Sequence, residues 1–264
     1  MTDILLVPPT LEPLTRTKAK LHLKSQQTAE DALVDGWIAA ARGFVEAYCT
    51  KALVLQTRRL MLDCFPDCIE IEWAPLRAVQ SIQYLDGEGS LQTLAVDQYR
   101  VDKLANPARI TPAYGVSWPT TYGVTNAVMV AYTAGMLMPF TAADGTDVIS
   151  VAGHGLADAD VVQVSTLGGT LPTGLAAATN YHVRDAAADT LKLSATAGGA
   201  AIDITGAGTA PNVIGRVPYE IEAAMCLMIS DLEQHRGEVI VGTIVQELQR
   251  GVEALLSRFK FQRF

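Results

Sequence analysis

The side chains best suited to hold a metal ion in this sequence are its cysteines. Cys64 and Cys68 are separated by three residues, a spacing that zinc-ligand pairs use. A zinc site needs a second ligand pair, and none of the four histidines stands in one. In a reducing compartment the two thiols would stay unlinked even if a turn brought them together. The sequence therefore predicts free, buried thiols and no metal site.

Acidic side chains offer a second chemistry, the binding of calcium. The middle of the chain carries Asp144, Asp147, Asp158 and Asp160. These residues lack the alternating spacing and the terminal glutamate of a calcium loop. We therefore interpret them as turn-forming residues.

Catalysis would need a nucleophile, a base and a group that stabilises developing charge. The sequence contains no Gly-x-Ser-x-Gly, no phosphate-binding loop, no His-Glu-x-x-His and no dinucleotide fingerprint. His154 lies in a Gly-His-Gly turn, and His235 stands among charged residues where a helix is expected to end. Glu70 and Glu72 share one face of a predicted strand, as solvent-exposed acids often do. We predict that the protein is not an enzyme and uses no cofactor.

The overall charge argues against general binding of polyanions. The 264 residues include 28 acidic and 20 basic side chains, a net charge of −8, whereas neutralising phosphates needs a local surplus of Lys and Arg. A localised basic patch stays possible. The first residues lack a basic n-region, so a signal peptide is not expected. The longest apolar stretch, residues 127–140, is too short to span a bilayer, and no membrane anchor is predicted.

Helices are predicted near both ends of the chain. Residues 14–23 form a short helix with Thr15 as its N-cap. Thr28-Ala-Glu-Asp31 resembles a capping box, and apolar residues then follow the 3.6-residue helical period, with Glu46 on the polar side. Pro218 opens a long amphipathic helix. A linker at 238–246 and a short last helix at 251–258 complete this prediction.

Between the helical regions the pattern changes to strands. Ile69, Ile71 and Trp73 alternate with polar residues, which indicates a strand with one buried face. The turn sequence Asp86-Gly-Glu-Gly89 predicts a hairpin, because its glycines can adopt positive φ. A small antiparallel sheet is expected from 79–85, 91–94, 99–101, 109–110 and 127–132.

Residues 141–216 differ from the rest, being poor in charge and rich in Gly, Ala and Thr. Short β runs separated by turn residues predict a barrel or a sandwich with its own core. The β runs lie at 148–151, 161–165, 181–184 and 190–194. The predicted fold class is therefore α+β: a helical domain with a small antiparallel sheet, formed by 1–140 and 217–264, and an inserted all-β domain at 141–216.

A series of short motifs runs through the elements outside the insert. The motifs are Thr-x-x-x-Ala-Lys-x-x-Leu from Thr15, Asp31-Ala-Leu33, Ile38-Ala-Ala-Ala-Arg42, Val45-Glu-Ala-Tyr48, Pro75-Leu-Arg-Ala-Val-Gln-Ser-Ile82, Tyr99-Arg-Val-Asp102, Pro107-Ala-Arg-Ile110, Val130-Ala-Tyr-Thr-Ala-Gly135, Val217-Pro-Tyr-Glu-Ile-Glu-Ala-Ala224 and Gly251-Val-Glu-Ala-Leu-Leu256. Their order resembles the head-to-tail connector, or adaptor, proteins of tailed bacteriophages. The insert is a departure from that family, and Lys18 stands where the family commonly has Glu.

The resemblance implies a structural virion protein, made in the host cytoplasm and located at the neck. Such proteins form a ring, typically twelvefold, between the portal protein and a downstream neck, stopper or tail protein. DNA would pass through the lumen without sequence-specific binding. A net acidic chain suits this role, because strong Lys or Arg contacts to phosphate would retard the DNA.

Two sets of residues are predicted to make contacts in such a ring. The small Ala223 and Ala224 would permit the close approach of a neighbouring copy. The C-terminal tail alternates basic and aromatic residues, and we expect it to be disordered in the free subunit and to dock on the portal. Its contact residues are Arg258, Phe259, Lys260, Phe261, Arg263 and Phe264. A frayed, unused terminus is the alternative.

A tail-associated protein that binds host-surface carbohydrate is the alternative function. Sugar sites commonly use aromatic platforms, and Tyr181 is the only aromatic residue of the insert, which counts against this alternative. Gly or Pro residues mark both ends of the insert, where insertion is well tolerated. We expect the insert to fold autonomously and to project from the outside of the ring.

Overall fold

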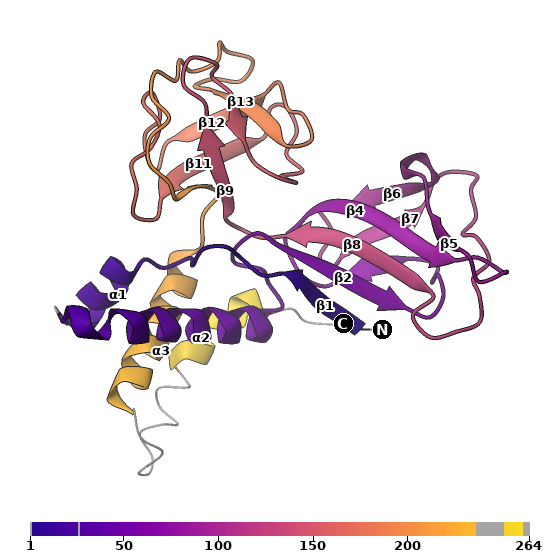
Figure 1. Ribbon diagram of the computed structural model, residues 1–264, viewed down its shortest axis with the longest axis horizontal. Helices are drawn as coiled ribbons and strands as arrows, with labels where there is room; N and C mark the ends of the chain where they lie inside the picture. The colour runs from indigo at the N-terminus through magenta and orange to yellow at the C-terminus, as the bar shows by residue number, and fades with distance from the viewer. Residues whose placement is uncertain (1, 26, 236–250, 261–264) are drawn as a thin grey trace.

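The computed structural model describes residues 2–25, 27–235 and 251–260. The linker predicted at 238–246 and residues 261–264 of the tail lie outside these ranges. The described chain forms a helical layer, a pair of sheets and a barrel (Figure 1). None of the helices in the described ranges combines the length and the apolar character needed to cross a bilayer.

A five-stranded antiparallel sheet forms the middle of the molecule. In spatial order its strands are β1 (Thr2–Val7), β2 (Gln56–Leu62), β8 (Val128–Ala134), β4 (Leu76–Leu85) and β5 (Leu91–Thr93). Buried and half-buried residues alternate along β2, because successive side chains of a strand point to opposite faces. The buried face shares one hydrophobic core with a three-stranded sheet of β3 (Ile69–Ile71), β7 (Ala108–Pro112) and β6 (Tyr99–Asp102).

The hairpin predicted around Asp86 is confirmed. β4 pairs with β5, and Asp86 Oδ1 accepts hydrogen bonds from the backbone N–H groups of Glu88 and Ser90 at 3.0 and 2.9 Å. Gly89 has a φ of +81°, as the turn requires. Strand β1 is not among the predicted elements, since Ile4–Val7 is a continuous apolar run with no alternation.

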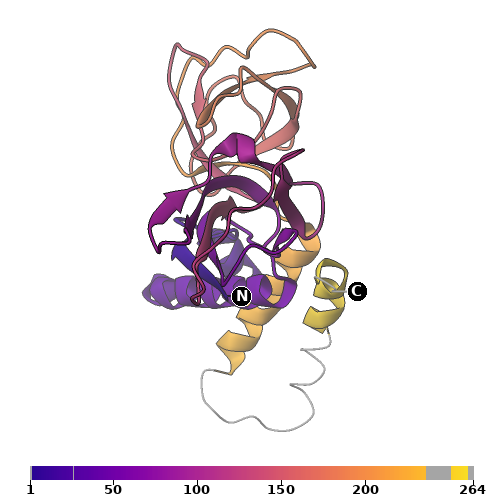
Figure 2. The same ribbon diagram turned by 90° about the vertical axis from the view of Figure 1, so that its right-hand side faces the viewer.

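The helical layer contains α1 (Arg16–Leu23), α2 (Asp31–Cys49), α3 (Tyr219–Gln234) and a last helical segment at 251–256. Thr15 caps α1 as predicted, its side chain accepting from the Lys18 N–H at 3.2 Å. The predicted capping box is wrong, because Thr28–Glu30 form a 3-10 turn and the residue before α2 makes no side-chain cap. Figure 2 shows α3 crossing α2, and these helices share a second core.

The inserted β region is a closed barrel. Around it run β10 (Ile149–Ser150), β13 (Thr190–Ser194), β12 (Asn180–Arg184), β11 (Val161–Thr166), β14 (Asn212–Ile214) and β9 (Met138–Ala142). It has its own core, separate from the other two. Strands β9 and β14 were not predicted. For β9 one reason is Pro139, because proline has no N–H to donate and its presence argues against a strand. These two strands pair with each other and close the barrel where the chain enters and leaves it.

The cysteines are all free thiols. The prediction of burial is correct for Cys49 and Cys226, and burial raises the pKa of both. It is wrong for Cys64, which is exposed, and for Cys68, which is half-buried, because both lie in the loop between β2 and β3 or next to it. Among the described residues, no group of three His, Cys, Asp or Glu side chains is placed to hold a metal ion.

Candidate interaction sites

The chain passes twice between the barrel and the rest of the molecule, and each passage packs closely against the backbone of another segment. A Cβ at Gly135 would lie 2.4 Å from Leu55 Cα, and one at Gly215 would lie 2.1 Å from the Met136 carbonyl oxygen. Arg77 holds the first passage, its Nε donating to the Gly135 carbonyl at 2.6 Å and its Nη2 to the Met136 carbonyl at 3.2 Å. Burial lowers the pKa of Arg77.

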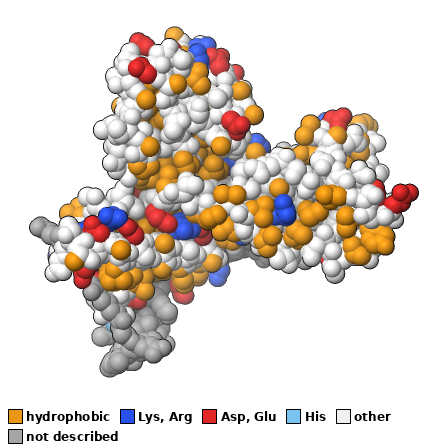
Figure 3. Space-filling model, viewed as in Figure 1, with side chains coloured by type: hydrophobic (Ala, Val, Ile, Leu, Met, Phe, Trp, Pro, Cys, Tyr) orange, Lys and Arg blue, Asp and Glu red, His pale blue; other side chains and the backbone are white. Residues whose placement is uncertain are grey.

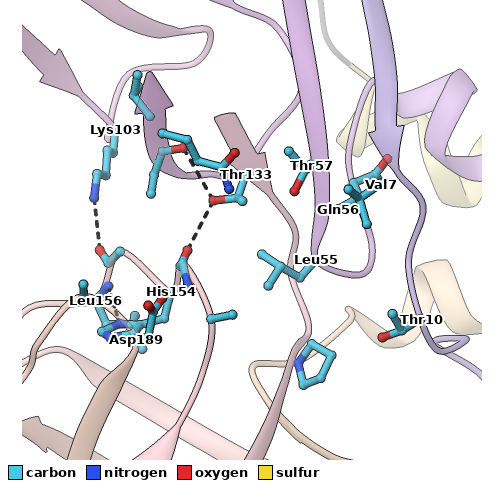
Figure 4. A pocket seen from close by; sticks show the side chains of 18 of the residues that line it. Val7, Thr10, Leu55, Gln56, Thr57, Lys103, Thr133, His154, Leu156 and Asp189 are labelled. Carbon is cyan, nitrogen blue, oxygen red and sulfur yellow. Dashed lines mark hydrogen bonds between the residues drawn. The ribbon is translucent and has the colours of Figure 1, made fainter. Parts of the chain in front are cut away.

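A third contact joins the barrel to the sheet, through the loop Gly153–Gly155 (Figure 4). Thr133 Oγ1 donates to the Gly153 carbonyl at 3.2 Å, and Lys103 Nζ donates to the Gly155 carbonyl at 3.1 Å. Gly155 has a φ of +57°, and a Cβ there would lie 1.9 Å from the Arg77 carbonyl oxygen. Only glycine fits this approach of the loop to β4.

His154 stabilises the shape of the loop through two hydrogen bonds to backbone groups. The predicted turn is present, but the side chain is buried, with 1% of its surface exposed. Its Nδ1 accepts from the Leu156 N–H at 2.9 Å, so the proton sits on Nε2, which donates to the Ala187 carbonyl at 2.7 Å. Asp189 accepts from the Gly153 N–H at 2.8 Å. Both nitrogens of His154 are therefore engaged, and it is not placed to act as a general base.

A cavity of about 900 Å³ lies between the barrel and the sheet, beside this loop. Figure 4 shows side chains from β1, β2, β8 and the barrel facing it. Its lining includes Val7, Leu55, Thr57, Lys103, His154 and Asp189. Because its charged and imidazole groups already have hydrogen-bond partners, the cavity presents no nucleophile and base poised for reaction.

A buried polar network connects the helical layer to the sheet. Glu46 is 5% exposed, so its predicted place on the polar side of the helix is wrong. Its carboxylate accepts from the Leu53 N–H at 2.8 Å, from Gln56 Nε2 at 3.0 Å and from Arg42 Nη1 at 2.9 Å. Burial raises the pKa of Glu46. The four-residue spacing from Arg42 was the only local sign of this pair.

The same network continues to the edge of the sheet. Arg58 Nε donates to Asp3 Oδ1 at 2.6 Å, and the guanidinium lies 3.5 Å from the centre of the Trp73 ring. The Tyr132 hydroxyl donates to the other Asp3 oxygen. Asp3 therefore anchors β1 to the buried side of the sheet.

The two alanines of the predicted subunit contact differ in exposure. Ala224 is fully buried in the core of the helical layer, so packing within the chain explains its small size. Ala223 is exposed on α3. Their role in contacts between copies stays a prediction.

The described part of the tail differs from the expected disorder. Ser257–Phe259 form a 3-10 turn, and Arg258 donates to Glu220 at 2.9 Å. Phe259 is half-buried against the helical core, and Lys260 Nζ lies 4.8 Å from the centre of the Tyr48 ring. The reason for this order is that the helical layer offers Phe259 an apolar surface. Phe261, Arg263 and Phe264 lie outside the described residues.

No family model and no curated protein sequence matches the chain. Solved structures with a similar fold include chains from gene transfer agent (GTA) particles. A chain from the neck of an empty GTA particle, computed with C6 symmetry, has a TM-score of 0.58 and 17% identity, covering 100% of this chain and 97% of that one. A chain from the virion of a native GTA particle has a TM-score of 0.57 and 16% identity, with the same coverage.

A third chain comes from the neck of a native GTA particle computed with C12 symmetry. Its TM-score is 0.50 at 16% identity, again covering 100% of this chain and 97% of that one. Because these matches span the whole chain, they include the helical layer, the sheets and the barrel. At this level of identity they establish a shared fold.

Proposed function

We propose that this chain is a structural subunit of the neck of a tailed, phage-like particle, and that it acts as a head-to-tail adaptor. The observation that carries the proposal is the likeness to GTA neck and virion chains over 100% of this chain and 97% of each of those. A match of this extent includes the barrel as well as the helical layer, so it does not rest on one widespread small module.

We further propose that the subunits form a ring between the portal and a downstream neck, stopper or tail protein. Support comes from the C6 and C12 symmetries of the two neck structures and from the order of motifs in the sequence. The lumen would hold DNA without sequence-specific binding, which suits a net charge of −8. The tail Arg258–Phe264 would contact the portal, and Ala223 on α3 would lie near the next copy.

The barrel is proposed to be an autonomous domain on the outside of the ring. Its closed strand order and its own hydrophobic core support this role. The carbohydrate-binding alternative has less support. Tyr181 is 4% exposed, and its hydroxyl accepts from the Ala176 N–H at 2.8 Å, so it cannot serve as a sugar platform.

A null mutation in the gene tests the proposal. We expect DNA-filled heads without tails, and restoration of tailed particles when the wild-type gene is supplied in trans. The protein should also be found by mass spectrometry in purified particles, in a whole-number ratio to the portal. Tailed, infectious or transducing particles formed at normal yield without the protein would refute a neck role.

A further inference from the structure

Two edges of the central sheet are unpaired. The sheet ends at β1 on one side and at β5 on the other, and in the described part of the chain each of these strands pairs on one side only. Four consecutive apolar residues of β1 are 38–52% exposed, and Leu91 of β5 is 56% exposed. Free backbone donors and acceptors beside exposed apolar side chains are suited to pairing with another strand.

Neither edge carries the charge that usually prevents such pairing. Ile4–Val7 and Leu91–Thr93 contain no charged residue. The one charged side chain of β1, Asp3, is turned inward to Arg58 and Tyr132. Figure 3 shows apolar side chains spread over this part of the molecule with few charges among them. Natural edge strands are commonly protected by lysines, inward-pointing charges, proline or very short length. In β1 the inward-pointing Asp3 lies near the start of the strand, and Pro8 and Pro9 follow its end, so the stretch Ile4–Val7 between them carries no lysine, charge or proline.

We propose that the outer edge of β1 in one copy pairs with the outer edge of β5 in a second copy of this chain. This inference rests on the proposed ring and names the contact that builds it. A ring needs two different complementary surfaces on each subunit, and the two edges of one sheet meet that need. Because Ile4–Val7 and Leu91–Thr93 contain no charged residue, pairing these two segments takes no ionised side chain of either segment out of water.

The directions of β1 and β5 favour their pairing between copies in a ring. All neighbouring strands of the sheet are antiparallel, and there are five of them, so β1 and β5 run in the same direction. Copies related by rotation about an axis along the strands therefore bring β5 and the next β1 together as a parallel pair. Pairing of β1 with β1 across a two-fold axis would be antiparallel and would stop at a dimer.

Cysteine cross-linking distinguishes these arrangements. The full-length chain, with Cys64 and Cys68 replaced by serine, would carry Leu6→Cys on β1 together with Gln92→Cys on β5, and a short bis-maleimide would link nearby thiols. Within one copy the two edges are about 19 Å apart, four strand spacings of about 4.8 Å, so a short linker can join them only between copies. A matched control pairs Gln92→Cys with Leu104→Cys, a loop position that is 98% exposed.

We expect the β1–β5 variant to give a ladder of dimers, trimers and larger species, and the Leu104 control to give none. A product that stops at dimers with Leu6→Cys alone would replace the proposal with pairing of β1 to β1. Rings seen by native mass spectrometry without β1–β5 links would overturn this contact and leave the neck function standing. The charge variant Leu6→Lys should abolish the rings while Leu104→Lys keeps them, and rings in both variants would also overturn it.

Discussion

Gly155→Ala should detach the 153–155 loop from the sheet without unfolding the barrel or the sheet. Gly155 has a φ of +57°, and an added Cβ would lie 1.9 Å from the Arg77 carbonyl oxygen. Since Cβ contacts below 3.0 Å are essentially never seen, the loop would have to retreat by roughly 1 Å. That movement stretches the hydrogen bonds from Thr133 to Gly153 and from Lys103 to Gly155, which now measure 3.2 and 3.1 Å.

The expected loss of free energy in Gly155→Ala has two parts. A non-glycine residue in the left-handed region costs about 1–2 kcal/mol. The two hydrogen bonds contribute about 0.5–1.5 kcal/mol each, so their loss adds about 1–3 kcal/mol. Gly198→Ala is the matched control, because Gly198 is also in the barrel with a φ of +70°, and among the described residues a Cβ there meets no other atom within 4 Å. The difference between the two variants, about 2 kcal/mol, measures the docking contact alone.

Hydrogen exchange measured by mass spectrometry is the assay. In Gly155→Ala we expect faster exchange in peptides covering the 153–157 loop and β4, while the barrel strands keep their protection. Chemical denaturation followed by tryptophan fluorescence should report the stability of the sheets and helices, because Trp37, Trp73 and Trp118 all lie outside the barrel. Equal exchange and equal stability in the Gly155 and Gly198 variants would refute the docking role of the loop.

Four further predictions concern other parts of the molecule. Arg77→Met should lower the free energy of unfolding by about 2–4 kcal/mol in denaturant titrations, since two carbonyls lose their donor, and an equal loss for the exposed Arg100→Met would contradict this. Burial raises the pKa of Glu46 above its ordinary 4.5, so the folded state holds this proton more tightly and the contribution of Glu46 to stability falls as pH rises from 4.5 through the raised pKa. In denaturant titrations at several pH values, Glu46→Gln should not show this fall in the free energy of unfolding. If the variant and the wild-type chain lose stability equally as pH rises, Glu46 is not the cause. Ala223→Glu should fold and yet be poorly incorporated into particles, whereas Ala224→Glu should fail to fold because its site is fully buried; normal incorporation of Ala223→Glu would remove this part of α3 from the subunit contact. Truncation after Ser257 should cost about 1 kcal/mol through the lost packing of Phe259 and should give filled heads that lack both adaptor and tail, while normal incorporation would refute docking on the portal.

Local patterns predicted the elements whose stability is local. The Thr15 cap, the apolar period of α2 and the Asp86 turn each depend on residues a few positions apart, and all three are present. The closed barrel falls within one of the two alternatives that turn spacing and composition indicated. A local signal also failed where a competing local structure formed, as Thr28–Glu30 show by forming a 3-10 turn in place of the capping box.

Structural elements that depend on partners far away in the sequence were not predicted. β1 is a strand because it pairs with β2, more than fifty residues later in the chain, and its own apolar run has no period of two. β9 and β14 likewise exist as a pair, although the barrel's other strands lie between them in sequence. The helical period assigns Glu46 to the polar face of α2. Its burial depends on Leu53 and Gln56, which follow the helix and donate hydrogen bonds to its carboxylate.

The amino-acid sequence by itself predicted the helices, the hairpin and a β-rich region in the middle of the chain, because periodicity, capping and turn chemistry act over a few residues. Only the tertiary structure showed which contacts fix the barrel against the central sheet. Arg77 reaches carbonyls 58 and 59 residues away, and Gly155 meets the backbone of β4 at a distance that no side chain tolerates. Such contacts depend on where separate segments meet in space, and no local pattern of residue types carries that information.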